Sequence, residues 1–109
     1  MLQEKYLILK TKKYWEDAIY SRFLSGETAY ANFPSPRWSN GELMKIHGTY
    51  CLLCNEYLFK DFNCLRCPFV TILKKLCIKS GGKSFCLNPC AETCRNFINN
   101  FNLMLEGIE

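Results

Sequence analysis

Two Cys-x-x-Cys pairs constrain the fold of this chain more than any other feature of its sequence. The pairs are Cys51-Leu-Leu-Cys54 and Cys64-Leu-Arg-Cys67, and nine residues separate them. One tight turn lets each pair present two sulfurs to an ion, and two pairs complete the four-ligand tetrahedron of structural zinc. The sequence therefore predicts that Cys51, Cys54, Cys64 and Cys67 bind one Zn(II) ion.

The length of the chain explains why such a metal would matter. A chain of 109 residues has the size of one domain, and folding at that size buries only about two-thirds of the surface that the unfolded chain exposes. Zinc binding needs thiolates in a folded site, so binding free energy on the order of 10 kcal/mol becomes folding free energy. We expect a small single domain over residues 1–109, mainly α-helical with irregular loops and organised around a pair of zinc knuckles that together supply four cysteines.

The cellular compartment decides how the eight cysteines are interpreted. Residues 1–13 mix apolar with charged side chains and do not resemble a signal peptide. The longest apolar stretch is also shorter than the roughly 20 residues that cross a bilayer. We therefore expect a cytoplasmic protein, in which disulfides are rare and paired cysteines act first as metal ligands.

Helical periodicity and helix-boundary signals divide the domain into two parts. Residues 11–24 have apolar side chains at helical spacing, and Pro34 and Pro36 then require an irregular connection. These features define an aromatic, helical N-terminal part with a proline-containing linker over residues 1–37. The cysteine-rich, zinc-binding part follows over residues 38–109.

Three helices are predicted in the second part. Ser39-Asn-Gly-Glu42 has the form of a capping box, which predicts a short helix to about Ile46. Pro68 suits the first position of a helix that continues to about Cys77. Asn88-Pro89 begins an amphipathic helix that runs to about Leu105. The face of this last helix that we expect to be buried consists of Cys90, Cys94, Phe97, Ile98, Phe101, Met104 and Leu105.

The remaining potential ligands leave alternatives open. Cys86, in a loop expected after Gly81-Gly82, could replace one of the four predicted ligands. His47 could also do so, although a surface role is the more common one for a single histidine. Cys77, Cys90 and Cys94 lie on apolar helical faces, where cysteine behaves as a small hydrophobic residue. The alternative is a second metal site that these three residues form with Cys86.

Other cysteine chemistry fits the sequence less well. An iron–sulfur cluster would use the same thiolates, and Cys64-x-x-Cys67-Pro68 resembles the end of a ferredoxin motif, but the closely spaced cysteines before it are missing. Thioredoxin-like redox chemistry requires a βαβ setting that the sequence does not predict. The chain has one histidine and no phosphate-binding or hydrolase motif, and a four-thiolate zinc site leaves no open catalytic position. We therefore expect a protein that is not an enzyme.

The formal charge of +4 raises the question of nucleic-acid binding. Four bound thiolates contribute four negative charges and Zn(II) two positive ones, so the charge falls to +2, and many lysines lie among acids. The positions available to contact phosphates are Arg66, Lys74, Lys75, Lys79 and Lys83. A nucleic-acid-binding zinc module is therefore the second hypothesis, after a zinc-stabilised module that binds a protein partner.

Several motifs together resemble a known group of proteins over residues 38–90. They are Trp38, Cys51-x-Leu53-Cys54, Cys64-x-x-Cys67-Pro68, Gly82-Lys-Ser-Phe85-Cys86 and Pro89. This pattern is similar to that of small, uncharacterised cysteine-rich proteins of bacteriophages and bacteria. The chain departs from that pattern in the shorter Cys86-to-Pro89 spacing and in the additional Cys77, Cys90 and Cys94. The resemblance implies a phage or mobile-element protein that binds a host protein, for example as an inhibitor of a defence nuclease.

Overall fold

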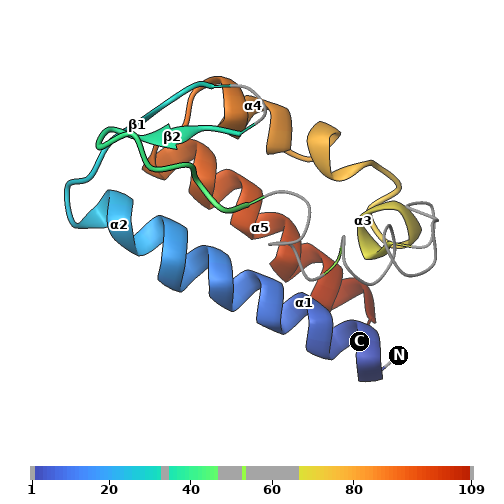
Figure 1. Ribbon diagram of the computed structural model, residues 1–109. Helices are drawn as coiled ribbons and strands as arrows, with labels where there is room; N and C mark the ends of the chain where they lie inside the picture. Colours follow the sequence, from blue (N-terminus) through green and yellow to red (C-terminus); the bar gives the residue numbers. More distant parts are fainter. Residues whose placement is uncertain (1, 33–34, 47–52, 54–66, 109) are drawn as a thin grey trace.

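The computed structural model describes residues 2–32, 35–46, 53 and 67–108 (Figure 1). In chain order, its elements are α1 (Leu2–Tyr14), the π-helix η1 (Trp15–Tyr20), α2 (Ser21–Leu24), β1 (Ala29–Tyr30), β2 (Arg37–Trp38), α3 (Pro68–Thr71), the 3-10 helix η5 (Cys77–Lys79), α4 (Gly82–Leu87) and α5 (Ala91–Ile108). The radius of gyration is 13.5 Å, close to the roughly 13 Å of a compact domain of about 100 residues. The prediction of a small, mainly helical single domain is confirmed.

The N-terminal helical segments form one rod that lies antiparallel to α5, so both chain ends lie at the same end of the molecule (Figure 1). The predicted helix over residues 11–24 is confirmed, and it extends back to Leu2 because the rod packs on α5. The buried positions of the rod are Ile8, Thr11, Trp15 and Ile19. Thr11 tolerates burial because its hydroxyl donates a hydrogen bond to the Leu7 carbonyl at 2.7 Å.

The rod ends where the sequence predicts. Gly26 has φ of 100°, a left-handed conformation that glycine adopts without a Cβ clash. The Gly26 amide donates to the Phe23 carbonyl and the Glu27 amide to the Arg22 carbonyl, at 3.1 and 3.0 Å. These two bonds form a Schellman motif, which satisfies carbonyls of the last helical turn.

A short antiparallel hairpin follows, with Ala29 opposite Trp38 and Tyr30 opposite Arg37. The predicted helix over residues 39–46 is wrong, because a turn brings the Glu42 carbonyl within 2.8 Å of the Trp38 amide. Gly41, with φ of 91°, allows this turn. Ser39 and Glu42 therefore belong to a turn after β2, which brings Leu43 back to an antiparallel bridge with Arg37.

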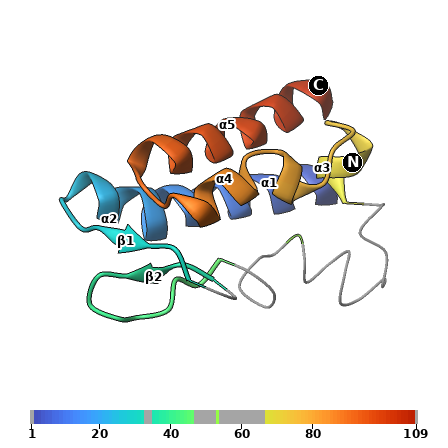
Figure 2. The same ribbon diagram turned by 90° about the horizontal axis from the view of Figure 1, so that it is seen from above.

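The helix predicted from Pro68 to Cys77 is also wrong beyond its first turn. It begins at Pro68 as predicted, but α3 ends at Thr71, and Lys74 has φ of 61°, a left-handed conformation that does not continue a helix. The chain instead forms η5 and then α4, where the sequence predicted a loop. Gly81 precedes α4 in the left-handed conformation. Helix α4 packs against η5 and also against α5, beside which it lies in Figure 2.

The C-terminal helix is the most accurately predicted element. It spans Ala91–Ile108, starting two residues later and ending three residues later than expected. Of the expected buried face, Cys90 and Leu105 are half-buried and the other members are buried. The core joins both predicted parts of the chain and consists of Ile8, Trp15, Ile19, Trp38, Met44, Ile46, Leu53, Phe69, Phe85, Cys94, Phe97, Ile98, Phe101 and Met104.

Aromatic rings connect the elements of this core. Trp15 of the rod packs against Phe97 of α5 at 4.6 Å between ring centroids and against Phe85 of α4 at 5.3 Å. Phe69 of α3 stacks on Phe97 at 5.6 Å. Such pairs contribute roughly 0.5–1.5 kcal/mol beyond the burial of their area. The rings therefore fix the positions of the short C-terminal elements against the two long helices.

Candidate functional site

The predicted zinc ligands are only partly within the described residues. Cys51, Cys54 and Cys64 lie outside them, as does His47, whereas Cys67 is described. Cys67 is half-buried, packs against the core and caps the start of α3. Its carbonyl accepts hydrogen bonds from the backbone amides of the first turn of α3, at 2.9 and 3.0 Å. Cys67 is therefore a fixed point at the C-terminal end of the cysteine-pair segment.

A second fixed point lies between the first two cysteines. Leu53 separates Cys51 from Cys54 in the sequence, and its side chain is only 1% exposed, as a member of the core. Full burial of a leucine contributes roughly 1.5–3 kcal/mol. The core thus contacts the chain within the first Cys-x-x-Cys pair and again at the end of the second pair.

The other cysteines lie in two pairs near α4 and the start of α5. The pKa of Cys86 is raised mainly by burial. The nearby Cys77 thiol raises it further. Cys90 and Cys94 are one turn apart, and the Cys94 amide donates to the Cys90 carbonyl at 3.0 Å. Among the described residues, no group of three or more cysteine, histidine or acidic side chains could hold a metal ion.

The properties of these thiols differ from one another. Cys94 is fully buried, and burial, followed by the nearby Cys90, raises its pKa to about 12. The Thr93 hydroxyl lies 3.4 Å from Cys90 Sγ, and hydrogen bonding to Thr93 lowers the pKa of Cys90. The prediction of a core role is confirmed for Cys94, but it is wrong for Cys77, which is exposed. The reason is that the helix expected to bury Cys77 ends before reaching it.

Cys86 lies on helix α4, where the sequence predicted a loop. Its side chain is half-buried against the core, and the helix is held by Phe85, the preceding residue, which is fully buried. A residue fixed in this way has less freedom to move into a metal site than a loop residue has. The geometry gives Cys86 a place beside Cys77, and its predicted role as a replacement ligand stays a prediction.

The basic residues proposed for phosphate binding share one segment. Lys74, Lys75, Lys79 and Lys83 are all exposed, whereas Arg66 lies outside the described residues. Residues 62–91 contain no Asp or Glu, so the expectation that lysines lie among acids is wrong for this segment. The ammonium group of Lys74 already donates one hydrogen bond within the protein, to the Thr71 carbonyl at 2.8 Å.

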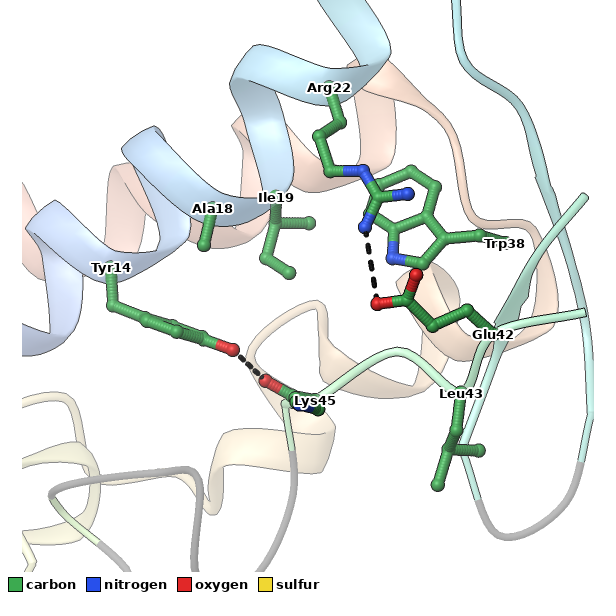
Figure 3. A pocket seen from close by; sticks show the side chains of 8 residues that line it. All are labelled: Tyr14, Ala18, Ile19, Arg22, Trp38, Glu42, Leu43 and Lys45. Atoms are coloured by element: carbon green, nitrogen blue, oxygen red, sulfur yellow. Dashed lines mark hydrogen bonds and ion pairs between the residues drawn. The ribbon is translucent and has the colours of Figure 1, made fainter. Parts of the chain in front are cut away.

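A pocket of about 160 Å³ lies between the helical rod and the hairpin (Figure 3). The Arg22 guanidinium lies over the Trp38 ring at 4.0 Å and faces Glu42, with 3.7 Å between their nearest charged atoms. Arg22 also makes two hydrogen bonds to Glu27, at 2.9 and 2.6 Å. The residues that line the pocket are Tyr14, Ala18, Ile19, Arg22, Trp38, Glu42, Leu43 and Lys45.

Electrostatics in this pocket are largely balanced. The hydrogen bond to Glu27 raises the pKa of Arg22, and the same bond lowers the pKa of Glu27. On the other edge, the Tyr14 hydroxyl donates to the Lys45 carbonyl (Figure 3). Since its guanidinium already faces two carboxylates, Arg22 serves to hold Trp38 and the hairpin against the rod. Sequence patterns did not identify this arrangement, because its members come from both predicted parts of the chain.

A second pocket, of about 230 Å³, lies between η1 and α5 and is lined mainly by polar side chains. Its members are Glu16, Tyr20, Arg95, Ile98, Asn99 and Asn102. Arg95 and the Tyr20 hydroxyl are 3.4 Å apart across it. Both pockets therefore border the π-helical segment, a type of irregularity that is frequent at functional sites.

Within the described residues, no helix is both long and apolar enough to cross a membrane. Comparison with protein-family models, with curated protein sequences and with solved structures found no match for this chain.

Proposed function

We propose that the protein is a zinc-stabilised, non-enzymatic module that binds a protein partner, with Cys51, Cys54, Cys64 and Cys67 as zinc ligands. The observation that carries the proposal is the attachment of the cysteine-pair segment to the core at two points. Leu53 is buried within the first pair, and Cys67 packs on the same core at the end of the second. A metal that joins the two pairs would close the segment between these points.

The donor set supports a structural role for the metal. Four thiolates match the tetrahedral preference of Zn(II) and leave no position for a substrate or an activated water. An iron–sulfur cluster is the alternative cofactor with the same ligands. Binding on the order of 10 kcal/mol is comparable with the roughly 5–15 kcal/mol total stability of a typical domain. Loss of zinc should therefore destabilise the whole fold.

Chelation with a set of cysteine variants tests this role. We expect a strong zinc chelator to lower the thermal midpoint by well over about 10 °C, because several kcal/mol are lost at several degrees per kcal/mol. Cys64→Ser and Cys67→Ser should remove the effect of the chelator. Cys77→Ser is the matched control, since Cys77 is exposed and outside the proposed ligand set. An unchanged midpoint after chelation of the wild-type protein would exclude a structural metal.

Cys86→Ser decides whether Cys86 replaces a predicted ligand. If the proposed four cysteines are the ligands, this variant keeps its zinc and its response to chelation. Loss of zinc from Cys86→Ser with retention by Cys51→Ser would instead assign Cys86 to the site.

The proposed partner is a host protein, and the supporting argument is the resemblance to phage proteins over residues 38–90. Small phage proteins often act by covering a surface of a host protein, and the described surface offers exposed apolar side chains. These are Tyr6, Leu9, Leu24, Tyr30, Leu76, Leu87 and Leu103. Inhibition of a defence nuclease is the specific form that we propose.

Phage plating tests the inhibitor proposal. Bacterial strains that each carry one defined defence nuclease would express the protein and be challenged with a phage that the nuclease restricts. We expect plating to recover in at least one strain, and a cysteine variant that has lost zinc to be inactive. Unchanged restriction in every strain would contradict nuclease inhibition and leave the zinc site to be judged by chelation.

Nucleic-acid binding is the second candidate function, and the exposed lysines of an acid-free segment favour it. Phosphate contacts by several lysines would make affinity fall steeply with salt, because each contact releases counterions. The test is a salt series with a DNA and an RNA duplex and their single strands. Absence of binding at low salt would exclude this function.

A further inference from the structure

The net positive charge of the protein is concentrated in one acid-free stretch. Residues 62–91 contain five Lys or Arg and no Asp or Glu, and the rest of the chain contains nine Lys or Arg and ten Asp or Glu. Within the described residues of this stretch, Lys74, Lys75, Lys79 and Lys83 are all exposed. This segment therefore attracts negatively charged partners, while the remainder is close to neutral.

Two exposed leucines, Leu76 and Leu87, lie on either side of Lys79 and Lys83 in the sequence. Leu76 and Lys79 share one turn at η5, where the Lys79 amide donates to the Leu76 carbonyl at 2.9 Å. Lys83 and Leu87 are four residues apart on α4, and residues at this spacing lie on one face of a helix. Leu76 is 40% exposed and Leu87 is 66% exposed. Each leucine is thus paired with a lysine on a single turn.

The two Leu–Lys pairs are carried by elements in close contact. A Cβ at Gly82, the first residue of α4, would lie 2.7 Å from the Cys77 carbonyl oxygen of η5. Phe85 lies on the side of α4 away from Lys83 and Leu87, where it is completely buried and packs against Trp15. The pairs are therefore held in a fixed arrangement before any partner binds, which lowers the entropic cost of binding.

We propose that Leu76, Lys79, Lys83 and Leu87 form a docking surface for an acidic protein segment that carries apolar side chains between its carboxylates. This inference rests on the proposed protein-binding function and names the chemistry of the partner. The lysines attract the carboxylates, and the leucines remove apolar area from water on contact. We call these four residues the Leu–Lys surface.

A protein segment fits the Leu–Lys surface better than nucleic acid does. Single-stranded nucleic acid binds through aromatic side chains that stack on bases, and the described aromatic residues of this stretch, Phe69 and Phe85, are buried. Phosphates would pair with the lysines but would leave the exposed leucines without apolar partners. Alternating apolar and acidic side chains match both components of the surface.

The test uses two synthetic helical peptides as probes. The first carries leucine and glutamate on one face in consecutive turns, and the second has serine in place of leucine. Fluorescence anisotropy measures affinity, and amide chemical-shift changes locate the contact. We expect the first peptide to bind more tightly, with shifts concentrated in residues 76–87.

Matched variants separate the surface from general electrostatics. Lys79→Glu/Lys83→Glu should weaken the first peptide by roughly tenfold, and Leu87→Ser by roughly fivefold, as expected for exposed charge pairs and partial leucine burial. Lys10→Glu/Lys13→Glu makes the same charge change on the exposed side of α1 and should alter affinity by less than about twofold. The lysines and leucines of the surface would then both be required.

Four results would overturn the inference: no binding of the first peptide, equal binding of both peptides, tighter binding of a DNA oligonucleotide, or tighter binding of phosphatidylserine vesicles. Zinc content is measured on the same samples. Zinc-loaded protein that fails to bind overturns the Leu–Lys surface alone, whereas folded protein without metal overturns the proposed zinc module.

Discussion

Replacement of Gly82 by alanine tests the close approach of η5 and α4, on which the Leu–Lys surface depends. Gly82 is the first residue of α4, and alanine is favoured over glycine in helices by about 1 kcal/mol. Helix propensity alone therefore predicts that Gly82→Ala stabilises the protein. The structure predicts the opposite, because the new Cβ would lie 2.7 Å from the Cys77 carbonyl oxygen and 3.3 Å from its carbon.

The steric cost should exceed the gain in propensity. The clash is with backbone atoms, which cannot rotate away as a side chain can, and overpacking of this kind costs roughly 1–3 kcal/mol. A cost in the upper part of this range, about 2–3 kcal/mol, less the gain of about 1 kcal/mol in helix propensity, leaves a net loss of about 1–2 kcal/mol. This loss corresponds to roughly 4–16 °C in the thermal midpoint of a domain of this size. Urea unfolding followed by circular dichroism measures the change in free energy of unfolding.

Ser84→Ala is the matched control on the same helix. Ser84 is exposed, so this substitution should change the free energy of unfolding by less than about 0.5 kcal/mol. A Gly82→Ala protein as stable as the wild type, or more stable, would contradict the close approach of η5 and α4. That result would mean that η5 does not lie against the first turn of α4, and the arrangement of the Leu–Lys surface would fail with it.

Three further predictions concern thiols and the pocket. Iodoacetamide should modify Cys90 well before Cys94 at neutral pH, because Thr93 lowers the pKa of Cys90 while burial raises the pKa of Cys94 to about 12. Mass spectrometry of the native protein measures the order of modification, and equal rates at the two cysteines would contradict this prediction. Arg22→Ala should lower the free energy of unfolding by about 1–2 kcal/mol, because the guanidinium covers Trp38. Urea unfolding measures this change, and an unchanged free energy of unfolding would contradict the stacking of Arg22 on Trp38. The pKa of Glu27 is lowered in the folded protein, so its stabilising contribution is present above its unfolded pKa of 4.5 and is lost as the pH falls through the lower folded pKa. Glu27→Gln should therefore reduce the slope of the free energy of unfolding against pH in that window, and an unchanged slope would contradict the pairing with Arg22.

The long helices could be predicted because their patterns are local and repeated. In α5, large apolar residues recur from turn to turn, and tertiary packing uses the face that the pattern indicates. The start of α1 lacked a comparable pattern. Its place in the helix depends on Ile8, which is completely buried and belongs to the core shared with α5, and a contact between residues so distant in sequence leaves little local signal.

The short elements were mispredicted where a local signal competed with long-range bonding. Ser39 and Glu42 satisfy the pattern of a capping box, but their backbone groups bond within the hairpin, where the Ser39 amide donates to the Thr28 carbonyl at 2.9 Å. The left-handed conformation of Lys74 ends the next helix early. Nothing in the sequence near Lys74 indicates a positive φ, which few residues other than glycine and asparagine adopt readily.

For the candidate sites, spacing in the sequence was informative only for the cysteines. The Cys-x-x-Cys pairs identify potential ligands without any structure, because adjacent sulfurs are positioned by a local turn. The stacking of Arg22 on Trp38 could not be predicted, since it depends on how the hairpin returns to the rod. The Leu–Lys surface also required the structure, because the sequence placed Leu76 in a helix that ends before reaching it, and Leu76 is exposed.

The metal content of the purified protein tests the central claim most directly. Protein prepared without added metal would be analysed by native mass spectrometry, elemental analysis and visible absorption. We predict a colourless protein with one zinc ion per chain, which Cys64→Ser/Cys67→Ser loses and Cys77→Ser retains. A folded protein without zinc, or one that contains iron and absorbs visible light, would contradict the account.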